Sequence, residues 1–491
     1  MPELVWSRAA FLTRAAAGAG LVLGSRVATG FDIADATAAP SATEAEPVRL
    51  FFSKPRLRPP RVTVLRRTEG TEDGLLFLAP SSGPGQRGVM IVDNDGEPVW
   101  FHPTRLTAMD FRAETYRGKP VLTWWEGRHI RGVGSVGEYV IVDQSYREIA
   151  RFSAGRGLRP DFHEYLLTPE GTALVTVYER VPADLSGVGG ASDGSVYSGV
   201  VQELEIPSAR VLFEWRSIDH VAFEETYLTK IFDPHDYFHI NSVGFDIDGH
   251  LLISARNTWG IYKVHRRTGE VIWRLGGKRS DFAMGKGTTF AFQHDARSHD
   301  HGRLISLFDN GPVPNTKRQS RGIVIALDTK NKRATLAREI VHRPSLFAFA
   351  TGNAQLFPSG SMFVCWGITG QFSEYGPDGK LRFDAKLPKG GQNYRVRRFK
   401  WTGRPGHRPR LASHPARARR RRLYASWNGA TEVAYWQFRI GETRGRLRDA
   451  RTVAKRAFET QFIAPKGTAY AVAVALDRRR RPLARSNAVR L

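Results

Sequence analysis

The chain has 491 residues, of which 41% are hydrophobic and 25% are charged. This length predicts two or more folded units, and the apolar content excludes a wholly disordered protein. The formal net charge of +25 is typical of nucleic-acid-binding proteins. Much of the excess lies in arginine runs, which we interpret as a solvated linker and a solvated hairpin tip, so no nucleic-acid partner is expected. These runs are Arg417 with Arg419–Arg422, and Arg478–Arg481.

Residues 1–38 have the arrangement of an export signal. Arg8 and Arg14 accompany the short apolar segment AAAGAGLVLG, and the small-residue sequence ATA ends the stretch. The segment SRAAFL resembles a twin-arginine motif in which Ala9 stands where the second arginine would be. We therefore expect export to the cell envelope or beyond, by a degenerate twin-arginine signal. The alternative is a disordered cytoplasmic N-terminus. No later stretch is predicted to span a membrane.

Residues 39–73 are predicted to be an extended lead-in, and the chain repeats itself from there. Strand pairs separated by turn residues recur about every 50–60 residues, a spacing typical of propeller blades. The recognisable strands are GLLFLAP, PVLTWW, ALVTVYE, LLISARN, RLISLFD and SMFVCWG. Several of the next strands end in an aromatic residue, namely Trp100, Trp215, Trp273 and Phe383. Six such units predict an all-β fold with a six-bladed β-propeller over 74–400. An open all-β array or two sandwiches are the alternatives.

The composition changes after the predicted propeller. Residues 401–422 are rich in proline, glycine and arginine and are predicted to be a basic linker, with a first edge strand inside it as the alternative. Residues 423–491 contain short alternating strands, with Trp427 early and Tyr470 late, and predict a small β-sandwich of fibronectin type III or immunoglobulin-like kind. We interpret this sandwich as an accessory module for packing or for attachment to the cell surface. Cys365 is the only cysteine and is expected to fill the core.

Three histidines occupy similar places in the repeat. His163, His239 and His294 each come shortly before an apolar strand pair. Because a propeller arranges its innermost strands around a central channel, these side chains should converge near the axis. A single such histidine is more often a hydrogen-bonded core residue. Three histidines at equivalent positions of the repeat, with Arg256 and Asn241 nearby, instead favour a functional site. Three other histidines lack this phase and are expected on the surface or in loops: His235, His299 and His301.

The candidate site combines histidines with an arginine, and no carboxylate occupies the equivalent positions of the repeat. Such a set of side chains is suited to binding an oxyanion. Arginine presents a planar fork to two oxygens, neutral imidazole can attack as a nucleophile, and protonated imidazole can donate a proton. Three histidines could alternatively bind zinc. Arg256 argues against zinc, because a cation is a poor neighbour for a divalent metal. No metal and no cofactor are expected.

Four motifs resemble those of the bacterial arylsulfotransferases, especially the branch found in actinobacteria and fungi. They are DFHEYLLTPEGTALVTVY, DYFHINSVGFDIDGHLLISARNTWGIYKV, TGEVIWRLGGKRSDF and FQHDARS. The resemblance covers about residues 51–401. It implies a six-bladed propeller that transfers a sulfuryl group from a phenolic sulfate ester to another phenol, without a nucleotide sulfate donor. The partners that it implies are a small aryl sulfate donor and a phenolic acceptor.

The resemblance also implies roles for individual residues. His294 matches the histidine that becomes transiently sulfated in a ping-pong reaction. The residues that match those holding the sulfuryl oxygens and handling protons are His163, His239, Asn241 and Arg256. Thr351 matches a threonine that also binds the sulfuryl group. Some exported members have a disulfide, which this chain cannot form from Cys365 alone.

Two other functions fit parts of the pattern. One is a propeller without chemistry, a scaffold that binds an anionic or carbohydrate partner through its face and its C-terminal sandwich. The other is a quinone-dependent dehydrogenase, another class of propeller enzyme, although no calcium-binding set of carboxylates supports it.

Overall fold

The computed structural model describes residues 46–130, 134–311 and 319–491, so the predicted export signal lies outside the described residues. Regular structure in this part of the chain is almost entirely β-strand, which confirms the all-β class. None of its helices has the length and apolar character needed to cross a membrane. The described helices are three-residue 3-10 turns: η2 (Ser186–Val188), η3 (Ser217–Asp219), η4 (Phe223–Glu225), η5 (Asp300–Gly302), η6 (Gly367–Thr369) and η7 (Arg417–Arg419).

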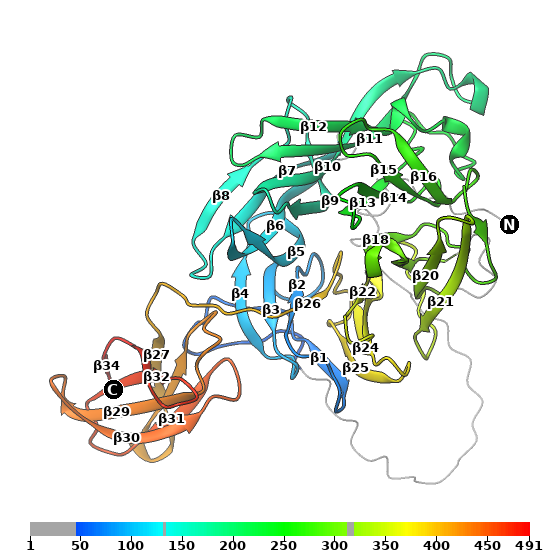
Figure 1. Cartoon of the computed structure of the whole chain (residues 1–491). Coiled ribbons are helices and arrows are strands. Elements are labelled where there is room, and N and C mark those ends of the chain that lie inside the picture. The colour runs from blue at the N-terminus through cyan, green and yellow to red at the C-terminus, as the bar shows by residue number, and fades with distance from the viewer. Residues whose placement is uncertain (1–45, 131–133, 312–318) are drawn as a thin grey trace, which may run out of the picture.

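Six antiparallel sheets follow one another along the chain and surround a common centre (Figure 1). The first sheet contains β2 (Leu75–Leu78), β3 (Gly88–Val92) and β4 (Pro98–Pro103). The second contains β5 (Thr107–Tyr116), β6 (Lys119–Ile130), β7 (Gly134–Val142) and β8 (Glu148–Phe152). The third contains β9 (Pro160–Leu167), β10 (Thr172–Ala183), β11 (Gly194–Glu205) and β12 (Val211–Arg216). The fourth sheet contains β13 (Ile240–Phe245), β14 (Leu251–Ala255), β15 (Gly260–Val264) and β16 (Val271–Gly276). The fifth contains β18 (His294–His299), β19 (Leu304–Asp309), β20 (Arg321–Asp328) and β21 (Arg333–Val341). The sixth contains β22 (Asn353–Leu356), β23 (Met362–Cys365), β24 (Gln371–Tyr375) and β25 (Leu381–Lys386).

Three further strands complete these sheets from distant parts of the chain. Strand β26 (Arg397–Phe399) pairs with β2, so the sheet that begins the series is completed by the strand that ends it. Strand β1 (Thr63–Arg67) pairs with β25 as an outer fifth strand, although the sequence predicts only an extended lead-in there. Strand β17 (Ala283–Met284) pairs with β21 in parallel.

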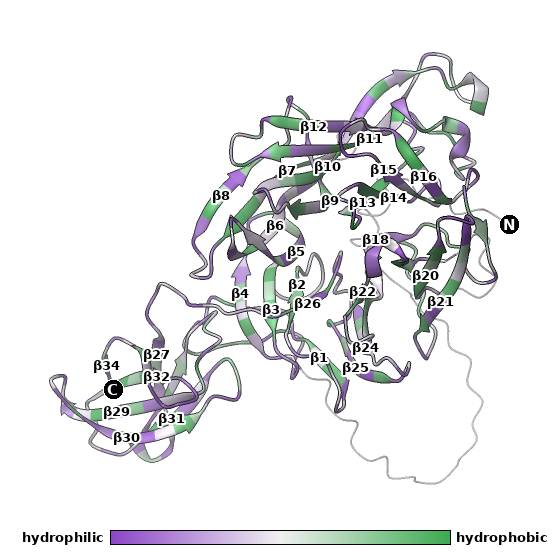
Figure 2. Cartoon of the chain, viewed as in Figure 1, coloured by the Kyte–Doolittle hydropathy of each residue, from purple (hydrophilic) through white to green (hydrophobic). Residues whose placement is uncertain are grey.

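The hydrophobic cores lie between consecutive sheets. One joins the sheets of β9–β12 and β13–β16 through residues such as Leu174 and Ile253, and another joins the last sheet to the first through Phe363 and Leu76. Because a middle strand is covered on both faces, it is almost entirely apolar, as in β3 and β14, whose residues are all buried and include one polar side chain, Ser254. Figure 2 shows these hydrophobic strands inside the sheets. Cys365 is buried in the core between the last sheet and the first, as predicted.

Two smaller sheets form the C-terminal region (residues 401–491). They contain β27 (Arg410–Pro415), β28 (Arg421–Ser426) and β31 (Thr460–Ala464), and β29 (Tyr435–Thr443), β30 (Arg446–Ala454), β32 (Tyr470–Leu476), β33 (Pro482–Arg485) and β34 (Val489–Arg490). One core joins the two sheets, and its buried tryptophan is Trp436, whereas Trp427 is only partly buried. The segment predicted to be a linker contains strand β27. This strand pairs with β28 along its whole length and so belongs to the sheet.

The C-terminal region is hydrogen-bonded to the first of the six sheets. The Asn428 amide accepts from the backbone N–H of Phe101 and donates to the carbonyl of Phe101. The backbone N–H of Gly429 donates to the carbonyl of Val99. These contacts fix the region beside β4, where Figure 1 shows it.

Candidate active site

The structure places the three predicted histidines at the beginnings of three consecutive sheets. His163 lies on β9, His239 directly precedes β13, and His294 is the first residue of β18. The ring centroids of His163 and His239 are 5.1 Å apart, in an edge-to-face arrangement. The charges of Arg256, His163 and His239 all act on His294. The predicted convergence of these side chains is therefore present.

The hydrogen bonds of His294 determine which ring nitrogen carries the proton. Nδ1 lies 2.7 Å from Oδ1 of Asn310 and 3.0 Å from the carbonyl oxygen of Phe292, and both partners are acceptors. The Asn310 amide cannot be reversed, because its Nδ2 donates to the carbonyls of Ala348 and Thr351. Nδ1 of His294 must therefore be the donor, and Nε2 carries the lone pair.

Burial keeps the His294 ring neutral. Desolvation lowers its pKa well below the usual value, and the positive charge of Arg256 lowers the pKa further. The hydrogen bond with Asn310 acts in the opposite direction but is the smaller effect. A neutral imidazole whose Nε2 carries no proton is the form that can attack an electrophile.

Each of the other two histidines is oriented by a carboxylate. Nδ1 of His163 lies 2.6 Å from Oδ2 of Asp161, and Nδ1 of His239 lies 2.6 Å from Oδ2 of Asp236. A carboxylate accepts the Nδ1 proton, fixes the tautomer and stabilises the protonated ring. Both histidines are thereby suited to carry and deliver protons from Nε2.

Arg256 directly follows β14 and packs against an aromatic ring. Its guanidinium lies 4.4 Å from the centroid of Phe292, and it donates to Oδ1 of Asn257 and to the carbonyl of Phe349. Burial lowers the pKa of Arg256 to about 10, which still leaves it charged at neutral pH. Within the described residues the guanidinium has no ion pair with a carboxylate, so its charge is available to an anion.

Thr351 and Asn241 complete the predicted set. The backbone N–H of Thr351 donates to Nε2 of His294 at 3.3 Å, and the Thr351 hydroxyl is buried without a hydrogen-bond partner. Nδ2 of Asn241 donates to the carbonyl of Gln293, next to the nucleophile candidate, and Oδ1 has no partner. Buried polar atoms without partners are costly and often mark a ligand site.

Three residues at the site have a left-handed backbone conformation, which residues with a side chain rarely adopt. His239, Phe292 and Thr351 have φ values of 54°, 52° and 60°, in the left-handed region. Such residues persist where the surrounding structure holds them, and they are concentrated at functional sites. The three lie respectively before β13, before β18 and before β22, where the chain enters the centre of the molecule.

A buried network of ion pairs lies beside the histidines. Oδ1 of Asp295, the residue after His294, accepts from Arg297 and Arg397. Arg395 bridges Asp110 and Glu164 and also donates to the carbonyl of Asn241. The network thus fixes the backbone on which the site residues stand.

The remaining histidines only partly match their predicted positions. His301 is exposed on η5, as expected. His235 is buried because its backbone pairs with Ser195 and Val196, and His299 is half-buried because Nε2 bonds to the Ser306 hydroxyl at 2.7 Å. His235 thus lies in a loop, as expected, although it is buried, whereas His299 lies on β18 and is half-buried, so the prediction of a surface or loop position was wrong for His299. Among the described residues no group of three histidine, cysteine or acidic side chains has a metal-binding arrangement.

The sequence reasoning missed Asn310, Asp161 and Asp236. The two aspartates could have been found, because each lies two or three residues before a predicted histidine. Asn310 comes 16 residues after His294, and no local pattern connects the two.

Comparisons with known proteins show weak structural likeness and one family match. A protein of unknown function from Bacteroides caccae is 13% identical, with a TM-score of 0.42 over 66% of this chain and 98% of its own. Virginiamycin B lyase from Staphylococcus aureus is 8% identical, with a TM-score of 0.33 over 66% of this chain and 87% of its own. No curated protein matches the chain.

The family model of the arylsulfotransferases (ASST) matches residues 112–387, which is more than half of the chain and contains every candidate site residue described above. The chain belongs to the arylsulfotransferase family.

Proposed function

We propose that this protein transfers a sulfuryl group from a phenolic sulfate ester to a phenolic acceptor through a sulfated histidine, His294. The observation that carries the proposal is the state of the His294 ring. It is neutral, its Nδ1 proton is held by Asn310, and its Nε2 lone pair lies beside the backbone N–H of Thr351. Family membership supports a sulfotransferase, and the geometry supports this route.

In the first half-reaction Nε2 of His294 attacks the sulfur of the donor. The N–S bond forms as the bond between sulfur and the phenolic oxygen breaks. The leaving phenolate takes a proton from protonated His163 or His239, whose ring is stabilised by its aspartate. Arg256, the Thr351 N–H and the second N–H of the Asn241 amide are the proposed donors for the sulfuryl oxygens, where negative charge is concentrated.

In the second half-reaction the acceptor phenol gives its proton to the histidine that was deprotonated in the first. The phenolate oxygen then attacks sulfur, the N–S bond breaks, and the neutral His294 ring is restored. Throughout, the Nδ1 proton remains on the ring and is held by Asn310, which stabilises the positive charge of the sulfated imidazole. A shared intermediate of this kind requires ping-pong kinetics.

An aromatic wall beside Arg256 suits the aryl part of both substrates. Trp259 stacks on Tyr227 with centroids 3.7 Å apart and an interplanar angle of 5°, and Phe292 meets Trp259 edge to face at 5.4 Å. Aromatic rings in such arrangements attract further rings. The wall therefore supports phenolic substrates rather than aliphatic ones.

We further propose that the six sheets are the blades of a β-propeller and that the C-terminal region is a β-sandwich. The domain boundaries proposed from the sequence are 74–400 and 423–491, and the structure adds β1 and β27 outside them. Export by the N-terminal segment is also part of the proposal. Mature protein from the native host should then begin near Ala39, and a soluble form that begins at Met1 or Pro2 would contradict export.

The reaction is tested by incubating the purified chain with a chromogenic aryl sulfate, with and without a colourless phenol. The proposal predicts continuous release of coloured phenol only when the acceptor is present, together with a sulfated acceptor. Release at the same rate without an acceptor would indicate hydrolysis, and no release from several aryl sulfates would favour a binding scaffold.

A further inference from the structure

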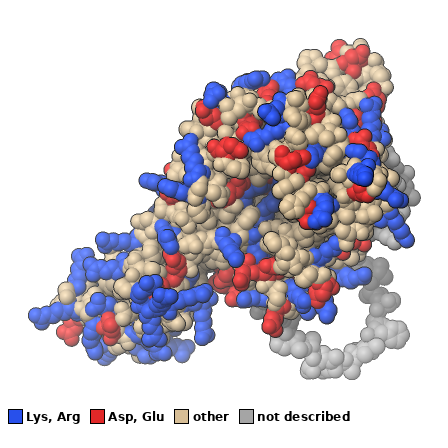
Figure 3. Space-filling view, in the orientation of Figure 1, with Lys and Arg blue, Asp and Glu red and all other residues tan. Residues whose placement is uncertain are grey.

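The positive charge of the molecule is concentrated in its C-terminal region. Residues 401–491 contain 22 lysines and arginines and 5 aspartates and glutamates, so this region carries +17 of the net charge of +25. Twenty of the 22 basic residues are arginines. In Figure 3 lysines and arginines prevail over acidic residues on the visible face of the region, whereas the six larger sheets expose both signs of charge.

Few of these basic side chains are neutralised within the protein. Three arginines pair with carboxylates of the region: Arg404 with Glu432, Arg439 with Asp449, and Arg481 with Asp477. None of the other 19 basic residues of this fully described region has an ion pair. An excess of this size exceeds what a solvated face needs for solubility, and it points to an anionic partner.

Part of this charge forms a track on strand β30, which is an edge of its sheet. Arg446, Arg448 and Arg451 are exposed along this strand. Arg448 and Arg451 lie opposite Ile440 and Phe438 on β29, which share one face of the sheet. The two arginines therefore leave the strand on the same side, about 7 Å apart along it.

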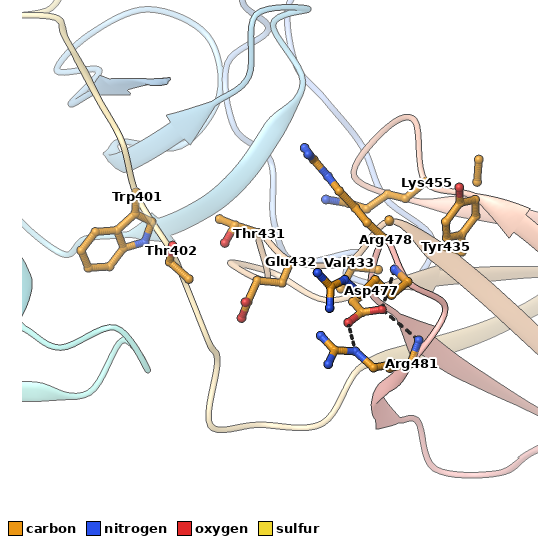
Figure 4. A pocket seen from close by; sticks show the side chains of 13 residues that line it. Trp401, Thr402, Thr431, Glu432, Val433, Tyr435, Lys455, Asp477, Arg478 and Arg481 are labelled. Atoms are coloured by element: carbon orange, nitrogen blue, oxygen red, sulfur yellow. Dashed lines mark hydrogen bonds and ion pairs between the residues drawn. The ribbon is translucent and has the colours of Figure 1, made fainter. Parts of the chain in front are cut away.

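The hairpin after β32 extends the track at the end of β30. Arg480 lies over the ring of Tyr435, 5.5 Å from its centroid, and Tyr435 is the cross-strand partner of Ala454. Arg478, Arg479 and Lys455 line a cavity of about 820 Å³ that also contacts Trp401 and Thr402. Figure 4 shows Arg478 and Lys455 beside this cavity, with Arg481 turned toward Asp477.

We propose that β30 and the 478–481 hairpin form a binding surface for a linear anionic polysaccharide. This basic edge is defined by Arg446, Arg448, Arg451 and Arg478–Arg480. Strand β30 alone is about 30 Å long, so it offers a row of cations to a chain whose units carry sulfate or carboxylate groups. Each arginine fork can hold two oxygens of such a group.

The composition of the basic edge disfavours two other classes of polyanion. Single-stranded nucleic acid is bound on stacking aromatic rings, whereas β30 contains no aromatic residue and the ring beside the hairpin, Tyr435, is covered by Arg480. Insertion into a membrane interface needs exposed apolar side chains, and the exposed large hydrophobic residues of the C-terminal region are Ile463 and Leu483, neither of which lies on β30. A hydrated polysaccharide needs neither feature.

The test measures binding of the full chain to dextran sulfate, with uncharged dextran as the reference. Changing Arg446, Arg448 and Arg451 to serine in one variant should weaken binding about tenfold or more near 150 mM salt. It should also flatten the salt dependence of binding, because three contacts between arginines and sulfate groups are lost. A matched triple change of Arg417, Arg419 and Arg420 to serine removes the same charge elsewhere and should weaken binding less than about threefold.

Several outcomes would overturn the proposal. Equal weakening by both triple changes would show diffuse attraction without a binding surface. Tighter binding to duplex DNA or to vesicles with anionic phospholipids, at equal charge concentration, would assign the surface to another class of partner, as would no binding to dextran sulfate at all. If the β30 variant does not fold, changing Arg478, Arg479 and Arg480 to serine gives the same comparison. Turnover of small aryl sulfates should be unchanged in every variant, so this surface is tested independently of the proposed chemistry.

Discussion

Nδ1 of His294 and Oδ1 of Asn310 lie 2.7 Å apart, and the amide nitrogen of Asn310 is tied to two backbone carbonyls. Asn310 thus presents only an acceptor to the ring, and the proton of a neutral His294 must stay on Nδ1. The nucleophilic nitrogen of the proposed reaction is therefore selected by a residue that does not contact the substrate.

Asn310→Ala should remove this selection and slow sulfuryl transfer roughly a hundredfold, because the ring can then rotate and change tautomer. Single-turnover release of phenol from an aryl sulfate measures the effect. The Michaelis constant of the donor should change little, since Asn310 is a positioning residue.

Asn310→Asp distinguishes positioning from general stability. It keeps an acceptor for Nδ1 and adds a negative charge, which should raise the pKa of His294 and move the acid limb of the rate profile to higher pH. A profile that matches the parent in both variants would show that Asn310 has no influence on the ring.

Arg256→Lys retains a charge but loses the planar fork. If Arg256 binds sulfuryl oxygens in the transition state, turnover should fall about a hundredfold or more. Arg266→Lys is a suitable control, because Arg266 is half-buried in the turn between β15 and β16 and pairs with Glu203 away from the site. Turnover of Arg256→Lys within a few fold of the control would exclude a role in binding the sulfuryl group.

Asp295→Asn should destabilise the protein, because it leaves Arg297 and Arg397 buried without their shared carboxylate. Breaking a buried ion pair from one side typically costs about 3–5 kcal/mol. Denaturant unfolding monitored by tryptophan fluorescence gives this value. Asp378→Asn, which breaks an exposed pair with Arg382, should have a much smaller effect, and equal losses would contradict the role of the central network.

Stability should depend on the protonation of His294. Its folded-state pKa lies well below the unfolded value of 6.5, so below pH 6.5 the unfolded chain binds a proton that the folded chain does not. The free energy of unfolding should fall with decreasing pH by up to about 1.4 kcal/mol per pH unit from this residue. Unfolding of the parent and of His294→Asn at pH 7.5 and 5.5 measures it; the same loss in both proteins would place the ring in contact with solvent.

The convergence of the three histidines could be predicted because each occupies the same position in its repeat, whereas Arg256 and Asn241 were included because they lie nearby in the sequence and match the family motif. Alternation and turn residues also predicted the all-β class. Asn310 was beyond reach, since its contact with His294 depends on how β18 and β19 pair and bend. The pairing of β26 with β2 joins residues more than 300 positions apart, and no local pattern specifies such a partner.

The ion network escaped prediction for a similar reason. Asp110 lies on β5, Glu164 on β9 and Arg395 shortly before β26, and the three meet only when the sheets surround one centre. Conversely, the buried position of His235 follows from a short bridge to Val196 that interrupts a loop. In each case the deciding contact is tertiary, and residue type alone gave no signal.

The central claim is that His294 carries the sulfuryl group between donor and acceptor. It is tested most directly by mixing the protein with an aryl sulfate alone and reading its mass at neutral or basic pH, because N–S bonds to imidazole are labile in acid. We predict one equivalent of released phenol, a mass increase of one sulfuryl group that maps to the peptide containing His294, and discharge on addition of phenol. His294→Asn should show neither burst nor adduct. An adduct that persists in His294→Asn, or that maps to His163 or His239, would contradict the account.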